Sequence, residues 1–132
     1  MKTFNEFLLL VEAKIRLDPD TYGGGGRLVT AHDAAGRQVG RLLLRKPNKD
    51  GFYCAARLEV DDDFQRQGIA TKMFDLAARH GLKIIPSDDL SPDSYALWYA
   101  HQKKKGQLNG APHPDSYPNV PDDMAKSHNW RW

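Results

Sequence analysis

The chain has 132 residues, the size of one ordinary domain, and a domain of this length can fold without disulfides or metal ions. Hydrophobic residues make up 40% of the sequence and charged residues 27%, which excludes a wholly disordered chain and indicates a soluble protein rather than a membrane protein. The net charge is only +2 and the basic residues are scattered, which argues against nucleic-acid binding.

The N-terminal segment predicts an amphipathic helix. Its apolar residues recur at the i, i+3, i+4, i+7 spacing of one helix face (Phe4, Phe7, Leu8 and Val11). Glu6 and Glu12 bracket this run and no small-residue cleavage site follows it, so we do not expect a signal peptide. The apolar face must be covered by the domain or by a partner.

A glycine-rich loop and three strands are expected next. Pro19 and the run Gly23 to Gly26 disfavour regular structure, and the run is read either as a plain connection or as a loop that closes over a ligand. The strands of an antiparallel meander are predicted over residues 27–31, 40–45 and 52–60. Two turn sequences that contain Asp and Gly separate them.

At Ile69 the apolar pattern changes to a helical period and predicts a helix followed by a strand. The helix runs to about His80, stops at Gly81, and buries one face (Ile69, Met73, Leu76 and Ala77). A short apolar run over residues 82–86 is read as a buried strand. A strand, helix, strand crossover is right-handed, which places this strand parallel to the third one and makes the sheet mixed.

A second helix is predicted from Ser91 to about Lys105, because Ser91 suits the cap and Pro92 the first turn. One side of this helix carries Tyr95, Trp98, Tyr99 and Gln102. The segment beyond Gly106 is rich in proline and predicts no regular element. Its final tryptophans, Trp130 and Trp132, are expected to pack on this domain or on a neighbour.

The helix predicted from Ile69 begins with small side chains, Gly68 and Ala70, in the sequence QRQGIA of residues 65–70, and these leave the backbone accessible. A helix start exposes N–H groups without a partner and the positive end of the helix dipole, so it favours an anion. Gly68 lets a phosphate approach where a Cβ would collide, and Thr71 adds a hydroxyl. A glycine that serves only packing or a turn is the alternative.

The longer stretch LEVDDDFQRQGIATKMFDLAARHG resembles the central motif of the GNAT acyltransferase superfamily, in which Gln or Arg is followed by two residues, Gly, one residue, and Gly or Ala. The order of elements from Arg27 to Lys105 is also similar. The resemblance implies an α/β (α+β) fold with a mixed central sheet and flanking helices. The chain is then one domain, with an N-terminal helix and loop (1–26), a core (27–105) and a proline-rich segment (106–132).

The resemblance also implies that acetyl-CoA binds as a co-substrate where the third and fourth strands diverge. The end of the third strand would face the pantetheine arm, and the amides of the next loop and helix start would hold the diphosphate. The residues expected to bind it are Leu58, Val60, Gln65, Arg66, Gln67, Gly68, Ile69, Ala70 and Thr71. No metal site is expected, because His113 and His128 have no companions at ligand spacing.

For catalysis, the resemblance implies an acid that protonates the departing thiolate and, in some members, a base that deprotonates the amine. Tyr99 is the candidate acid, with Tyr95 in reserve, although both positions also suit an aromatic core. Glu59 is the carboxylate nearest to the expected reaction point and is the candidate base, unless it simply faces water. A chain of water molecules is the alternative to a base.

The expected activity is transfer of an acetyl group from acetyl-CoA to a primary amine of a small molecule or protein. The alternative is a non-catalytic GNAT-fold component that docks on a larger assembly through its N-terminal helix and aromatic tail. The short N-terminal region and the missing final hairpin depart from the family, and the opening MKTFNEFLL is similar to the starts of some phage-encoded proteins. The single cysteine, Cys54, favours a reducing compartment, the cytoplasm, and we expect neither membrane nor nucleic acid as a partner.

Overall fold

The computed structural model describes residues 14–18, 24–65, 68–88, 90–116, 121 and 124–132. The helix predicted at residues 4–11 lies outside this part of the chain. The described elements are β1 (Lys14–Leu17), β2 (Arg27–His32), β3 (Gln38–Leu44), β4 (Phe52–Val60), η1 (Asp62–Phe64), α2 (Ile69–Arg79), β5 (Lys83–Ile85), α3 (Pro92–Lys105), η2 (Pro114–Ser116) and α4 (Met124–Ser127).

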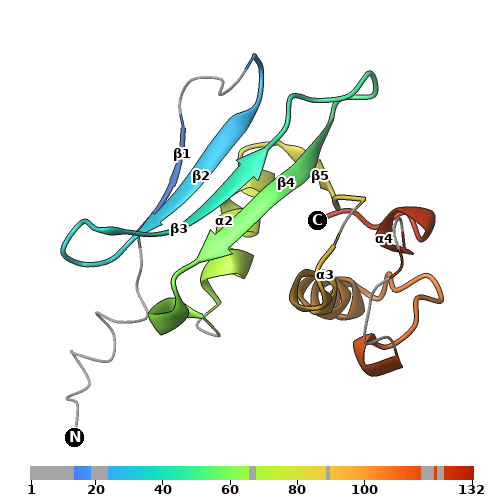
Figure 1. Cartoon of the computed structure of the whole chain (residues 1–132). Helices are drawn as coiled ribbons and strands as arrows, with labels where there is room; N and C mark the ends of the chain where they lie inside the picture. The colour runs from blue at the N-terminus through green and yellow to red at the C-terminus, as the bar shows by residue number, and fades with distance from the viewer. Residues whose placement is uncertain (1–13, 19–23, 66–67, 89, 117–120, 122–123) are drawn as a thin grey trace, which may run out of the picture.

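The described strands form one mixed sheet in the order β1-β2-β3-β4-β5 (Figure 1). Strands β1 to β4 are antiparallel neighbours, and β5 pairs with β4 in the parallel direction. This arrangement confirms the predicted meander and the parallel strand after the first long helix. The bounds of β4 agree with the prediction, whereas those of β2, β3 and β5 differ from it by one or two residues.

Strand β1 is missing from the sequence prediction, which has only a helix and a glycine loop before Arg27. Its four residues alternate between exposed and half-buried positions and carry little local signal. The strand is held by antiparallel pairing with β2, where Ile15 lies opposite Ala31 and Leu17 opposite Val29. Pairing of this kind depends on tertiary context, which the periodicity of four residues does not report.

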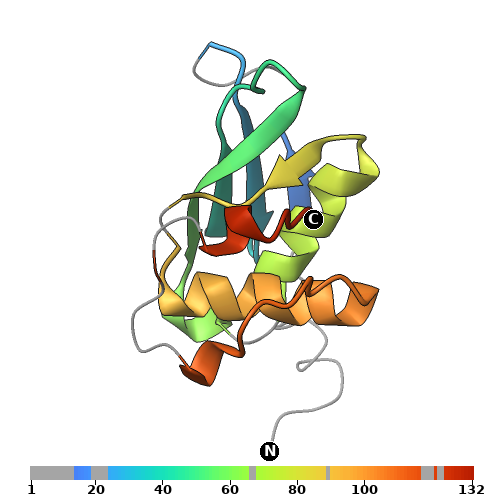
Figure 2. The ribbon, with the colours of Figure 1, turned by 90° about the vertical axis from the view of Figure 1, so that its right-hand side faces the viewer.

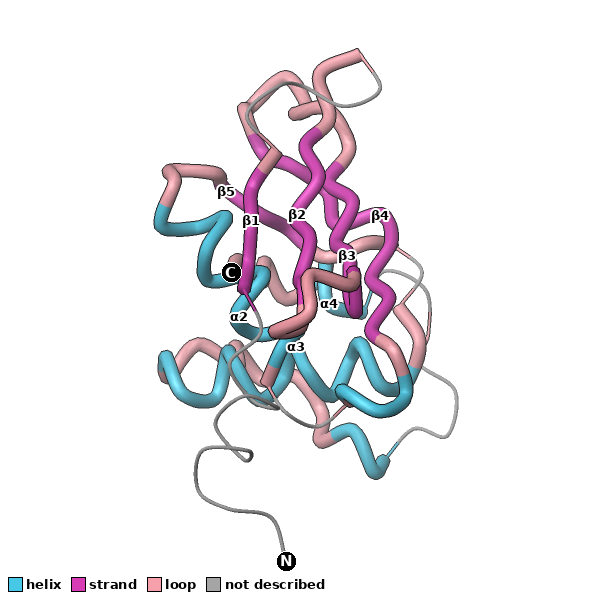
Figure 3. Tube along the Cα trace, turned by 90° about the vertical axis from the view of Figure 1, so that its left-hand side faces the viewer, coloured by secondary structure: helices cyan, strands magenta, loops and turns pink. Residues whose placement is uncertain are grey.

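Helix α2 covers one face of the sheet (Figure 3). Its buried side chains pack on the buried residues of β2 and β3 in the core. Gly40 on β3 allows this close approach, because a Cβ there would lie 3.4 Å from Met73 Cε and 3.3 Å from the carbonyl oxygen of Glu59. The described helices leave the opposite face of the sheet uncovered, and we call it the open face.

Helix α3 begins and ends as its sequence predicts. The Ser91 side chain accepts a hydrogen bond from the Ser94 amide, and Gly106 ends the helix in the left-handed conformation at φ 69°. The buried side of α3 carries Tyr95, Trp98 and Gln102, as expected from their spacing. Figure 2 shows the C-terminal segment packed alongside this helix.

The C-terminal segment packs on the domain itself. Trp130 is fully buried, donates its indole N–H to the Leu108 carbonyl at 3.2 Å, and stacks on Tyr95. Trp132 stacks on Phe74, and its amide donates to the carbonyl of Ile84 in β5 at 3.0 Å. Both tryptophans therefore pack on this domain, as one of the two expectations had it, with Trp130 fully buried and Trp132 half-buried.

Protonation of His101 is expected to weaken this packing. The His101 ring stacks on Trp132, with the ring centres 3.8 Å apart, and burial lowers the pKa of His101 below its usual 6.5. The unfolded chain therefore takes up this proton first, so the stability is greatest above pH 6.5 and falls as the pH drops to the folded pKa. We expect the melting temperature to fall less between pH 7.5 and 5.5 in His101→Phe than in wild type. Equal falls would contradict this assignment.

Candidate functional site

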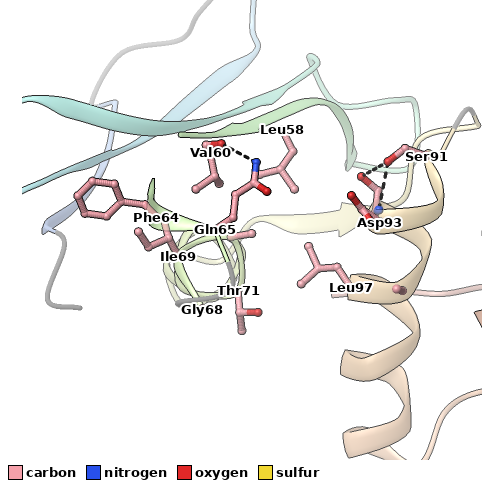
Figure 4. A pocket seen from close by; sticks show the side chains of 13 residues that line it. Leu58, Val60, Phe64, Gln65, Gly68, Ile69, Thr71, Ser91, Asp93 and Leu97 are labelled. Carbon is pink, nitrogen blue, oxygen red and sulfur yellow. Dashed lines mark hydrogen bonds between the residues drawn. The ribbon is translucent and has the colours of Figure 1, made fainter. Parts of the chain in front are cut away.

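A groove of about 550 Å³ opens between β4, the start of α2 and the start of α3 (Figure 4). Its size suits a small-molecule ligand. The residues that line it are Leu58, Val60, Phe64, Gln65, Gly68, Ile69, Ala70, Thr71, Ser91, Asp93, Ser94, Ala96 and Leu97.

The groove exists because β5 pairs with only the first part of β4. The parallel pairing runs from Phe52 to Cys54 on β4, and β5 ends at Ile85. Beyond this point β4 continues to Val60 and keeps β3 as a neighbour on its other edge. The edge of β4 that faces α3 is therefore free of β5 over its second half, next to the groove.

The N-terminus of α2 reaches the groove without a cap. Gly68 occupies the N-cap position at φ 76° and has no side chain that could accept a hydrogen bond from the first turn. The first helical bond runs from the Lys72 amide to the Gly68 carbonyl, so the amides of the first turn, from Ile69 to Thr71, precede the helical ladder. A Cβ at Gly68 would meet no atom within 4 Å other than those of its chain neighbours, so the space beside Gly68 is open.

The N-terminus of α3 also lines the groove, but it is already satisfied. Ser91 Oγ accepts from the Ser94 amide at 3.2 Å, and Asp93 places a carboxylate in the first turn. An anion would meet that carboxylate and an occupied cap. Of the two helix starts at the groove, α2 is therefore the one that favours an anion.

Gln65 connects the end of β4 to the start of α2. Its Nε2 donates to the Val60 carbonyl and to Asp62 Oδ1, each at 3.2 Å. These bonds span the η1 turn, in which Phe64 is buried. The Gln65 side chain thus fixes the geometry of the loop, and this amide group is engaged by the protein.

The structure brings most of the predicted binding residues together. Arg66 and Gln67 lie outside the described residues. The predicted residues that line the groove are Leu58, Val60, Gln65, Gly68, Ile69, Ala70 and Thr71.

Comparison with known proteins points to one fold. The sequence matches no family model and no curated protein. The structure is similar to that of a putative acyl-CoA N-acyltransferase from Klebsiella pneumoniae, with a TM-score of 0.51 and 10% identity over 70% of this chain and 81% of that one. The chain has the GNAT fold.

Two further GNAT structures are similar at lower scores. A GNAT-family acetyltransferase from Staphylococcus aureus has a TM-score of 0.47 and 15% identity, over 77% of this chain and 66% of that one. A GNAT N-acetyltransferase from Escherichia coli, solved with CoA, has a TM-score of 0.49 and 18% identity, over 68% of this chain and 71% of that one. This chain thus spans about two thirds of the length of these two proteins.

Glu59, the candidate base, does not line the groove of this GNAT fold. Side chains alternate along β4, so Glu59 points to the open face while Leu58 and Val60 line the groove. Arg41 Nε donates to Glu59 Oε2 at 2.7 Å, and this hydrogen bond lowers the pKa of Glu59. A carboxylate held in this way is a poor acceptor for a proton from an amine.

Tyr99, the candidate acid, also lies away from the groove. Its ring packs at 5.4 Å from that of His113 and at 6.3 Å from that of Trp130, on the side of α3 that carries the C-terminal segment. The reserve candidate, Tyr95, donates its hydroxyl to the Pro112 carbonyl at 2.7 Å. Tyr95 is therefore part of the aromatic core and Tyr99 packs half-buried against it, which agrees with the alternative given for both positions.

Sequence reasoning missed several polar groups of the groove. Ser91 was assigned only as a helix cap, while Ser94 and Asp93 had no assigned role at a ligand site. The side chains of α3 that line the groove are those on the face of the helix that turns toward β4. The apolar Leu97 on this face is the one sequence signal that could have indicated which face that is.

The described residues contain no group of three or more His, Cys, Asp or Glu side chains that could hold a metal ion. No helix in the same part of the chain is long and apolar enough to cross a membrane.

Proposed function

We propose that this protein is an N-acetyltransferase that moves an acetyl group from acetyl-CoA to a primary amine. The observation that carries the proposal is the uncapped N-terminus of α2 at the groove, beside the half of β4 that β5 does not pair with. The GNAT fold of the chain supports the same function.

The groove fits the chemistry of this co-substrate. A diphosphate is an anion, and the first-turn amides from Ile69 to Thr71 offer donors at the positive end of a helix dipole. A pantetheine arm combines amides with methylene groups. The free edge of β4 can hydrogen-bond those amides, while Leu58 and Leu97 offer apolar contact on the two sides of the groove.

In the proposed reaction the amine nitrogen forms a bond to the thioester carbonyl carbon, the carbon–sulfur bond breaks, and CoA leaves as a thiolate. The nitrogen loses one proton and the sulfur gains one, so the reaction balances without a further reactant. Because Glu59 and Tyr99 lie away from the groove, we assign binding and orientation to the chain and both proton transfers to water.

The alternative function, a non-catalytic component that docks on a larger assembly, is weakened by the packing of the aromatic tail. It needs an aromatic tail that is free to dock on another protein, whereas Trp130 is fully buried and Trp132 stacks on Phe74 and His101. Docking through residues 1–13 is not affected by this observation, since they lie outside the described chain.

Acetyl-CoA is expected to stabilise the protein. A ligand at 100 times its dissociation constant adds about 2.7 kcal/mol to the free energy of unfolding. For a domain of this size we expect the melting temperature to rise by roughly 8 °C in a thermal scan. CoA and pantetheine are compared as controls: both lack the acetyl group, and pantetheine also lacks the phosphates and the nucleoside, so it should give a much smaller rise than CoA. No difference between CoA and pantetheine would overturn the phosphate assignment, and no rise with acetyl-CoA would overturn the function.

A further inference from the structure

The open face of the sheet carries an excess of positive charge. The strand registers place Arg16, Thr30, Arg41 and Glu59 opposite one another in a row across β1 to β4. A neighbouring row ends in Arg57 on β4, and Lys14 lies at the start of β1. Asp18 continues the neighbouring row at the end of β1, because its amide donates to the Leu28 carbonyl at 2.8 Å. These rows and Lys14 hold four cationic side chains and two carboxylates, which leaves an excess of positive charge on the open face.

One of the two carboxylates, Glu59, is already neutralised by its neighbours. Glu59 pairs with Arg41 at 2.7 Å and lies 3.8 Å from Arg57. Lys14 and Arg16 are exposed on β1, and no ion pair involves either of them among the described residues. The positive charge therefore extends from Lys14 and Arg16 on β1 across the sheet to Arg57 on β4.

The open face also has an apolar component. Leu28 on β2 lies opposite Leu43 on β3, and Leu43 lies opposite Arg57 on β4. Both leucines are half-buried and neither belongs to the core cluster or packs against it. No aromatic side chain stands in these rows to stack on a base, so the face suits an acidic peptide better than a nucleic acid.

Strand β4 joins this face to the proposed reaction site. Leu58 and Val60 line the groove, while Arg57 and Glu59 point to the open face one residue away. Helices α2 and α3 flank the groove, so an acceptor that binds on the open face approaches the free edge of β4 from the side opposite α2. The amine of such an acceptor then reaches the groove by passing the edge of a single strand, β4.

We infer that the acceptor docks on the open face and is a peptide segment whose amine is flanked by carboxylates. The inference rests on the proposed function, because it names the acceptor of that same site. Arg16 on β1 is three strand spacings, or about 14 Å, from β4, which is the span of a peptide rather than of a single small molecule. Carboxylates would meet Arg16, Arg41 and Arg57, and apolar side chains would meet the two leucines.

The test uses three peptides that are identical except at the residues beside one lysine, which are Glu, Gln or Lys. Each is incubated with acetyl-CoA and the released thiol is measured. We expect kcat/KM for the Glu peptide to exceed that for the Gln peptide at least tenfold, and the difference to shrink as salt is added. Equal rates, or a preference for the Lys peptide, would overturn the inference.

A charge reversal at Arg16 tests whether the peptide binds on the open face. Arg16→Glu should lower kcat/KM for the Glu peptide about tenfold, with little change for the Gln peptide and no change in the thermal shift caused by acetyl-CoA. Lys49→Glu is the matched control, because Lys49 is exposed in the turn at the other end of β4. Equal effects of the two substitutions would contradict the assignment to the open face.

Direct binding keeps this inference separate from the proposed function. Fluorescence anisotropy of the labelled Glu peptide needs no acetyl-CoA, and we expect binding that Arg16→Glu weakens. If acetyl-CoA fails to shift the melting temperature while the peptide binds, the proposed function fails and the docking surface stands. Tighter binding of a duplex DNA probe, or equal use of free aspartate as acceptor, would overturn the choice of an acidic peptide.

Discussion

Replacing Trp130 with alanine is expected to lower the free energy of unfolding by about 3 to 5 kcal/mol, the usual loss for a buried tryptophan. The Trp130 side chain is fully buried, stacks on Tyr95 with the ring centres 5.2 Å apart, and donates its N–H to the Leu108 carbonyl. Truncation leaves a cavity and an unsatisfied carbonyl. Urea unfolding followed by circular dichroism measures the change.

Trp130→Phe is the control, because it keeps an aromatic ring and removes the indole N–H. We expect a smaller loss than for alanine, since most of the apolar contact survives. The exposed Lys49→Ala should change stability by less than about 0.5 kcal/mol. If Trp130→Ala fell in that same range, the C-terminal segment would not be part of the core.

The C-terminal residue Trp132 connects strand β5 to helix α2. An unpaired strand edge invites association with other chains, and β5 is one of the two edge strands of the described sheet. The Trp132 amide bonds to the Ile84 carbonyl on β5, and the Trp132 indole donates to Asp75 Oδ1 at 2.8 Å on α2. The segment therefore ties β5 to α2 without forming a further strand.

Local sequence signals predicted the elements that begin or end at strong markers. Gly68 and Gly81 mark the two ends of α2, Ser91 and Gly106 those of α3, and all four act at those positions in the structure. These signals are local, because a left-handed φ or a capping hydroxyl acts on its own helix end. The predicted residues that line the groove could be placed there for the same reason, since the motif sits at one such end.

The catalytic candidates depended on information that is not local. Tyr99 was chosen for its position on α3, but the C-terminal segment packs on that side of the helix and its rings surround Tyr99. Glu59 was chosen for its nearness to the end of β4, but the strand alternation turns it to the open face. Which side of an element meets a groove depends on packing against distant segments, as it does for the pairing of β1.

Gly68→Asp is expected to abolish the stabilisation by acetyl-CoA while the protein stays folded. A Cβ at this position meets nothing within 4 Å, and Asp tolerates the left-handed conformation that Gly68 adopts at φ 76°. The new carboxylate would occupy the open space before the first-turn amides and repel a diphosphate there. We expect at least a tenfold loss of affinity relative to Gly68→Asn, which has the same shape without the charge.

Thermal scans with and without acetyl-CoA compare these variants with Gly81→Asp. Gly81 has a similar left-handed φ of 85°, also meets nothing within 4 Å, and lies at the opposite end of α2. Gly81→Asp should melt lower without ligand, because a carboxylate at a helix C-terminus is unfavourable, yet keep the full ligand-induced shift. If Gly68→Asp kept that shift as well, the start of α2 would not hold the diphosphate, and the groove would need another ligand.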